Sequence, residues 1–183
     1  EPPTLENNNV QPLDENHIIA ERRQKLAALR SNGIAYPNSF KPQNGACDLQ
    51  DKYKDQSHDD LESANVGVKV AGRIMLKRIM GKASFVTIQD GLEKIQLYVS
   101  RDKIGEASYT NFKQLDLGDI IGVAGKLFKT KTDELTIEVH ELSLISKCLR
   151  PLPEKFHGLT DQELCYRQRY LDLIMNQESR ELF

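Results

Sequence analysis

The sequence contains no tryptophan, only three cysteines and no long apolar run, and these shortages exclude several classes of protein. Cys47, Cys148 and Cys165 are too far apart for a CxxC zinc site, and an odd number of cysteines does not suit a disulfide framework. No run of 18 apolar residues is present, which excludes a transmembrane helix. No basic segment followed by an apolar stretch opens the chain, so nothing indicates secretion. We therefore expect a reduced, cytoplasmic protein.

Neither sign of charge dominates the 183 residues, but charge is unevenly distributed along them. The 25 basic and 27 acidic residues give a net charge of −2. Residues 1–65 carry −4, residues 66–147 carry +3 and residues 148–183 carry −1. The positive region opens with a stripe of five cations and no acid, which attracts phosphate groups, although a solvated strand face is an equally good interpretation. The cations of this stripe are Lys69, Arg73, Lys77, Arg78 and Lys82.

The hydrophobic pattern divides the chain into four segments. Prolines and asparagines at the start predict a flexible arm. Apolar residues at helical spacing then predict a helix from 14 to 31 with basic residues around its other sides, and a loop with a short helix near 59–64 follows. The segments are the arm (1–13), the amino-terminal helix and loop (14–65), a region of strand periodicity (66–149) and a proline-containing linker with its helix (150–183).

The strand region predicts five strands with a helix between the third and the fourth. Gly72 lies inside an unusually long first strand and suggests a bend or bulge there. A helical stretch near 101–114 separates the first three strands from the last two. These features are typical of the five-stranded Greek-key barrel called the OB-fold. The predicted fold class is therefore an all-β core with flanking helices, one before the barrel and one in the linker.

Alternation along the strands also predicts which side chains point outward from the barrel. If Val86 and its apolar neighbours fill the barrel, Phe85 points outward, and so do Gln96 and Tyr98 on the next strand. An exposed ring can stack on a nucleobase, and an amide can hydrogen-bond its edge. Glu134 opens the outward face of the fifth strand, where a carboxylate would select a base that presents an N–H. We therefore predict a site for an unstacked nucleobase.

Two features of this site leave alternatives open. Arg78 has the parity of the core residues before it, so it can face a ligand only if the first strand bends or ends before Gly81. Phe85 could instead be covered by another element, and Gln96 could be an ordinary surface glutamine. A structural or partner-binding barrel therefore remains an alternative, as does a single-strand-binding OB protein that tolerates any sequence.

Four longer strings are distinctive, namely VAGRIMLKRIMGKASFVTIQD (70–90), KIQLYV (94–99), LGDIIGVAGKLFKTKTDELTI (117–137) and RPLPEKFHGLTDQELCYRQRYLDLI (150–174). These strings resemble the amino-terminal region of bacterial class II lysyl-tRNA synthetases. The resemblance covers nearly everything from about residue 14 onward, and YRQRYLDL is similar to the segment that leads into the class II catalytic domain. Aspartyl and asparaginyl synthetases share the barrel and are less similar through GKASFVTIQD and KFHGL.

The resemblance implies that the barrel binds the anticodon stem-loop of tRNA(Lys). Phe85 would stack on the central uridine and Gln96 would hydrogen-bond its edge. Arg78 would reach the same base or its phosphate, and Glu134 would help to read the anticodon. The weaker phosphate contacts that we predict beside these residues are Arg73 and Lys82.

The resemblance also implies that the catalytic domain, with its ATP, Mg²⁺ and lysine sites, would follow Phe183. The sequence offers no phosphate-cradling glycine loop and no clustered metal site. We therefore expect an RNA-binding fragment with no catalytic residue, metal or cofactor of its own, which binds neither membrane nor DNA. The intact family protein is an ATP-dependent ligase and a homodimer. The histidines, which we take as isolated, are His17, His58, His140 and His157.

Overall fold

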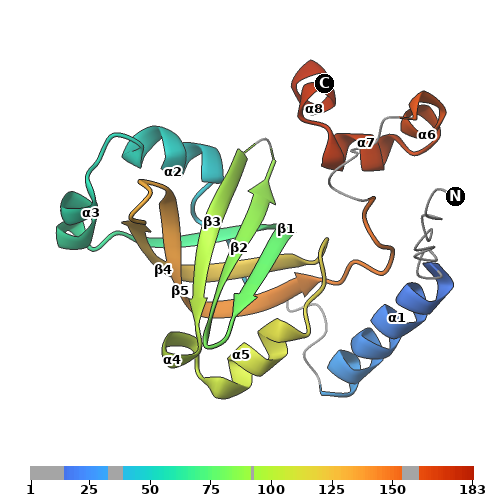
Figure 1. Cartoon of the computed structure of the whole chain (residues 1–183), viewed down its shortest axis with the longest axis horizontal. Coiled ribbons are helices and arrows are strands. Elements are labelled where there is room, and N and C mark those ends of the chain that lie inside the picture. The colour runs from blue at the N-terminus through green and yellow to red at the C-terminus, as the bar shows by residue number, and fades with distance from the viewer. Residues whose placement is uncertain (1–14, 33–38, 92, 154–160) are drawn as a thin grey trace, which may run out of the picture.

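The computed structural model describes residues 15–32, 39–91, 93–153 and 161–183, and its centre is a closed five-stranded barrel. The strand order is β1-β2-β3-β5-β4, and every neighbouring pair is antiparallel except β3 and β5 (Figure 1). This closed sheet confirms the predicted OB-fold barrel. The strands are β1 (Gly67–Met80), β2 (Ala83–Asp90), β3 (Glu93–Ser100), β4 (Ile120–Lys129) and β5 (Leu135–Ser146).

Helices precede, interrupt and follow the barrel. Figure 1 shows α1 and α5 near the lower end of the barrel, and α6 to α8 set apart from it. Within the described ranges, no helix is both long enough and apolar enough to cross a membrane. The helices are α1 (Glu15–Ser31), α2 (Ala46–Tyr53), α3 (His58–Ala64), α4 (Arg101–Ile104), α5 (Glu106–Lys113), α6 (Gln162–Arg167), α7 (Arg169–Met175) and α8 (Gln177–Leu182).

The helical predictions need three corrections. Helix α2 lies in a stretch that we expected to be loop. The helix expected over 101–114 is divided at Gly105, whose φ of 88° lies in the left-handed region that favours glycine. The linker helix is divided at Gln168, and Asp161 caps its first part by accepting from the backbone N–H of Glu163. The predicted arm lies outside the described residues.

The apolar face of each strand fills the barrel, as the alternation predicts. Burial alternates residue by residue along β2 and β3. Helix α5 adds the buried rings of Tyr109 and Phe112 to this core. Tyr109 also forms a hydrogen bond of 2.8 Å with the buried Ser84 hydroxyl on β2. The helix therefore closes one end of the barrel, and the outer faces of β2 and β3 are left for other contacts.

A bulge in β1 changes the direction in which the second half of the strand points its side chains. The pairing of β1 with β2 shifts between Ile74 and Leu76, so Met75 is the extra residue. Beyond the bulge, Arg78 pairs directly with Phe85 and is exposed. Strict alternation had placed Arg78 with the core, and the bulge removes this conflict by reversing the parity of the strand.

The same bulge turns Lys77 inward, towards α5. Its Nζ donates to the backbone oxygens of Phe112, Lys113 and Leu115 at 3.1, 2.8 and 2.6 Å. Burial lowers the pKa of Lys77 to about 8. A cation among the last carbonyl groups of a helix stabilises the helix end. Lys77 therefore holds α5 in place and is not part of the phosphate-attracting stripe in which we had placed it.

Buried ion pairs fix α1 to the barrel. The Lys147 side chain is 1% exposed, and its Nζ lies 2.6 Å from Asp116 and 2.8 Å from the fully buried Asp119. Asp116 also pairs with Lys25 of α1 at 3.1 Å. Burial raises the pKa of the Asp116 carboxyl, but the hydrogen bonds and positive charges of Lys147 and Lys25 together outweigh this effect and hold the pKa below its ordinary value. We call these residues, with Arg22 of α1, the α1 network.

Arg22 extends the α1 network to the chain that leaves the barrel. Its guanidinium donates to the backbone oxygens of Leu117, Cys148 and Arg150 at 3.2, 2.9 and 3.4 Å. Arg22 is 8% exposed, and Leu26 on the same helix is 6% exposed. The inner side of α1 is therefore held by charged as well as apolar side chains. Two of the basic residues expected on its polar surface, Arg22 and Lys25, are used within the protein.

Candidate nucleic-acid interface

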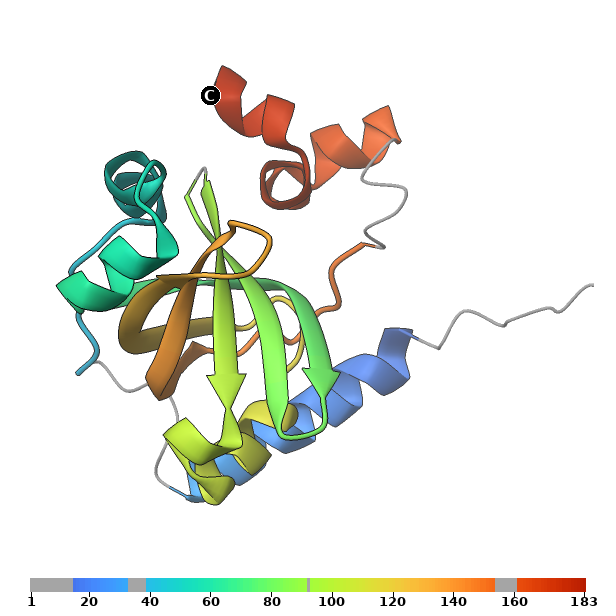
Figure 2. The same ribbon diagram turned by 60° about the vertical axis from the view of Figure 1, so that its left-hand side comes forward.

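A hollow of about 440 Å³ lies on the outer face of the barrel. Strands β1, β2 and β3 form its floor, and the loop 130–134 between β4 and β5, which crosses in front of β3 in Figure 2, forms its rim. The four residues that we predicted to contact a base all line this hollow. The lining residues are Leu76, Arg78, Phe85, Thr87, Gln96, Thr130, Lys131, Thr132 and Glu134.

Phe85 is the aromatic wall of the hollow. It points away from the barrel core and is partly exposed, so it is not covered by another element, which was the alternative for this residue. Its ring lies 5.3 Å from the ring of Tyr98 at an angle of 54°, and Tyr98 in turn meets Phe128 edge-on at 6.2 Å. The contact with Tyr98 holds the Phe85 ring in place. A fixed, partly exposed ring is a suitable surface for stacking a nucleobase.

Gln96 lies on the floor of the hollow, and its amide is held by Thr136 of β5. Thr136 is Gln96's partner in the parallel pairing of β3 with β5, and its Oγ1 donates to Gln96 Oε1 at 2.9 Å. Thr136 is fully buried and was not among the predicted site residues. Only the β3–β5 pairing brings the two residues together, and this pairing joins strands that are not consecutive in the sequence.

The rim of the hollow is a loop closed by its own hydrogen bonds. Thr130 N donates to Glu134 O at 3.0 Å, and Glu134 N donates to Thr130 Oγ1 at 3.2 Å. Asp133 has a φ of 60°, which turns the chain back towards β5. The loop therefore places a negative charge, the Glu134 carboxylate, and a positive charge, the Lys131 ammonium, on the same rim. Lys131 was not predicted, although the run KTKTDE placed a cation near Glu134.

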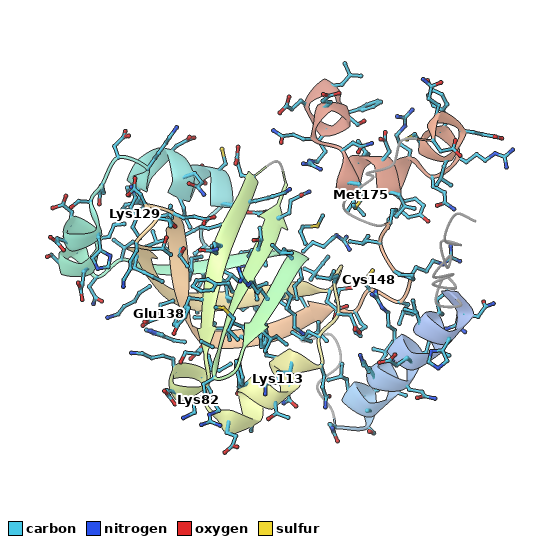
Figure 3. All side chains as sticks on the ribbon, in the orientation of Figure 1. Lys82, Lys113, Lys129, Glu138, Cys148 and Met175 are labelled. Carbon is cyan, nitrogen blue, oxygen red and sulfur yellow. The ribbon has the colours of Figure 1, made fainter. Side chains whose placement is uncertain are left out.

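Two predicted phosphate contacts lie outside the hollow. Arg73 donates to Gly118 O at 2.8 Å and covers the turn before β4. Lys82 is exposed at the tip of the β1–β2 hairpin, where its backbone oxygen accepts from Arg101 N at 2.9 Å. Figure 3 shows Lys82 beside α4, whereas Lys129, which precedes the rim loop, lies towards α2 and α3. The roles of Arg73 and Lys82 as phosphate contacts stay predictions.

Two of the histidines, His58 and His140, are less isolated than the sequence indicated. His140 lies 3.0 Å from Glu138, and the hydrogen bond from His140 lowers the pKa of that carboxyl. His58 lies 3.6 Å from Glu62 on α3 and, with Asp59, could reach a single metal ion. All three side chains are exposed, which is common for acidic groups on protein surfaces, and the arrangement has no buried ligand that would mark a built metal site.

Comparison with known proteins agrees with the geometry of the barrel. The model of the OB-fold nucleic acid binding domain family matches residues 68–145. The chain is 58% identical over 175 residues to the lysine–tRNA ligase of Methylobacillus flagellatus, a match that covers 96% of this chain and 34% of the relative. For the lysine–tRNA ligase of Cupriavidus taiwanensis the identity is 59% over 171 residues, covering 93% and 33%.

The lysine–tRNA ligase of Azoarcus sp. is 57% identical over 181 residues, which cover 98% of this chain and 36% of the relative. The chain thus spans about a third of the length of the curated relatives that it matches. Its similarity runs through the barrel, the amino-terminal helix and the linker alike. Over nearly its whole length the chain is therefore similar to a part of lysine–tRNA ligases, and its barrel matches the OB-fold nucleic acid binding domain family.

Proposed function

We propose that this chain recognises the anticodon of tRNA(Lys) and that the hollow holds the central base of the anticodon. The observation that carries the proposal is that Phe85, Gln96, Arg78 and Glu134, which come from four separate parts of the sequence, line one hollow. Uridine presents one N–H donor and two carbonyl acceptors, and it can stack on an aromatic ring. An amide, a carboxylate, a guanidinium and a phenyl ring match those needs.

Each residue has a distinct part in this proposal. Phe85 stacks on the base, and Gln96 donates a hydrogen bond to one of its carbonyl oxygens. Glu134 can only accept, so it pairs with an N–H of the anticodon. Arg78 lies directly across from Phe85 and reaches the base or its phosphate. Lys131 on the rim adds a second cation for the RNA backbone.

In the whole protein, we propose that this region holds the tRNA while the remainder ligates lysine to it with ATP through an aminoacyl-adenylate. The described residues do not fit the cofactors of that reaction, because they offer neither a glycine-rich phosphate loop nor a buried carboxylate cluster for Mg²⁺. No step of the ligation is therefore assigned to this chain, and ATP–pyrophosphate exchange with the chain alone should give no signal. By the same family likeness, the whole protein is a cytoplasmic homodimer.

Titration with short RNA hairpins tests the anticodon proposal. Hairpins with the lysine anticodon UUU should bind more tightly, by about tenfold, than hairpins whose central base is changed, because a lost hydrogen bond at a desolvated base costs about that much. Fluorescence anisotropy at one fixed salt concentration measures the difference. Equal affinity for all hairpins would indicate a sequence-tolerant single-strand binder. Absence of binding would indicate a structural barrel.

A further inference from the structure

The amide of Gln96 could present either of two atoms to a base in the hollow, and these atoms have opposite hydrogen-bonding character. Nε2 donates and Oε1 accepts. An amide that turns freely about its last bond offers both, and it would then pair equally well with the O4 carbonyl of uridine and the N4 amino group of cytidine. Discrimination between these two pyrimidines therefore requires a neighbour that holds the amide in one orientation.

The neighbour that holds the amide is Thr136. Its Oγ1 lies 2.9 Å from Gln96 Oε1 and 3.1 Å from the backbone oxygen of Glu134. Thr136 is 0% exposed, so bulk water does not compete for its hydroxyl proton. A buried hydroxyl that donates to Oε1 leaves Nε2 as the part of the amide available to the hollow. Within the described ranges, Nε2 has no hydrogen-bond partner.

The hydroxyl has one proton and two acceptors within reach, which makes the direction of the bond decisive. If the proton went to Glu134 O alone, Oγ1 would accept from Nε2, and Gln96 would present Oε1 to the hollow. The two arrangements select opposite bases. The shorter of the two contacts is the one to Gln96, at 2.9 Å against 3.1 Å. The hollow also already has an acceptor in the Glu134 carboxylate, so a donor on its floor complements that group.

We propose that Thr136 is a positioning residue that turns the donor side of Gln96 into the hollow, so that the hollow selects uridine over cytidine at the central anticodon position. This inference rests on the proposed function of the hollow. Thr136 does not line the hollow and acts only through Gln96. Its hydroxyl, and not its shape, is the feature that matters, which makes serine an equivalent residue and valine a deficient one.

The experiment compares the binding of UUU and UCU anticodon hairpins to the 183-residue chain and its variants. For Thr136→Val, the ratio of the two affinities should fall about tenfold, because the amide of Gln96 is no longer held by a buried hydrogen bond. Thr136→Ser should restore the ratio. Thr110→Val is the matched control, because this threonine lies on the exposed side of α5 and bonds only Glu106 O of its own helix. Thermal unfolding checks that each variant is folded.

The outcomes separate the inference from the function on which it rests. A native chain without preference for UUU overturns the proposed function. A native preference for UUU that survives in Thr136→Val overturns the role of Thr136 and leaves the function standing. If Thr136→Val does not fold, Gln96→Glu provides the second test, because a carboxylate offers acceptors only. Gln96→Glu should shift the preference towards UCU, and an unchanged preference for UUU would contradict the donor orientation of Gln96.

Discussion

The hollow and the α1 network contain the same kinds of charged residue in opposite situations. In the α1 network, Lys147 is buried against two carboxylates, and Arg22 contacts three backbone oxygens. In the hollow, Arg78 and Lys131 are exposed, and neither has an ion-pair partner among the residues that the structure describes. Charges that are paired inside a protein hold elements together. Unpaired charges beside a partly exposed aromatic ring are available to a ligand.

This comparison predicts that neutralising a lysine greatly reduces stability in the α1 network and hardly changes it in the hollow. Lys147→Met should lower the free energy of unfolding by about 3–5 kcal/mol, because it leaves the fully buried Asp119 without its ion-pair partner. Lys131→Met should change it by less than about 0.5 kcal/mol, since Lys131 is exposed. Urea unfolding followed by circular dichroism measures both. Similar losses in the two variants would remove the distinction between the regions.

The second prediction concerns binding. Phe85→Ala should weaken binding of the UUU hairpin by about 1–3 kcal/mol, the range found when a stacking ring is removed. Phe128→Ala is the matched control, because Phe128 belongs to the same row of rings but does not line the hollow. Anisotropy titrations of both variants make the comparison. An equal loss in Phe128→Ala would show that the row supports the barrel and that the hollow has no special part in binding.

The outward positions of Phe85 and Gln96 could be predicted because strand alternation is a local property. Phe85 and Gln96 lie on regular strands whose apolar residues fill the barrel, so the outward face follows from the sequence. Arg78 is the exception to this alternation. The single extra residue Met75 reverses the parity of β1, and a bulge depends on how the strand must coil to close the barrel. Alternation alone therefore gave Arg78 the wrong side.

Contacts between distant segments could not be predicted, because they depend on the tertiary structure and not on the local sequence. The bond from Thr136 to Gln96 depends on the pairing of two non-consecutive strands. The position of Lys131 depends on the loop that folds over β3. Lys77 and Arg22 point inward because backbone carbonyl groups at the end of α5 and in the linker lie close enough to accept their hydrogen bonds. The sequence shows where the cations are, but only the tertiary structure shows which of them remain available to a ligand.

Acid should weaken the α1 network. Because the pKa of folded Asp116 lies below its ordinary value of 3.8, this carboxylate stabilises the fold above that pH, and the contribution is lost as the pH falls through the folded pKa. The loss should be smaller than that in Lys147→Met, because Asp116 remains 21% exposed. Urea unfolding at pH 6, 5, 4 and 3 tests this.

The matched variant for the acid test is Asp116→Asn, which removes the titrating group. Its unfolding free energy should depend less on pH below about 4 than that of the native chain, where an unshifted aspartate would begin to titrate. Native and variant chains that lose stability in parallel over this range would show that other carboxylates, and not the α1 network, control the response to acid.

The smallest expected effect distinguishes cations inside the hollow from those outside it. Each phosphate contact with single-stranded nucleic acid contributes about 0.7 to the slope of log affinity against log salt. Lys131→Ala should reduce the slope by about that amount for the UUU hairpin and lower affinity only a few-fold at moderate salt. Lys82→Ala should do the same only if the RNA extends to the tip of the β1–β2 hairpin, where Lys82 lies.

A lower slope in Lys131→Ala alone would confine the RNA to the hollow, whereas a lower slope in Lys82→Ala alone would move the backbone path to the α4 end of the barrel. Because neither lysine reads a base, both variants should retain the preference for uridine, and a changed preference would mean that Lys131 contacts the base itself.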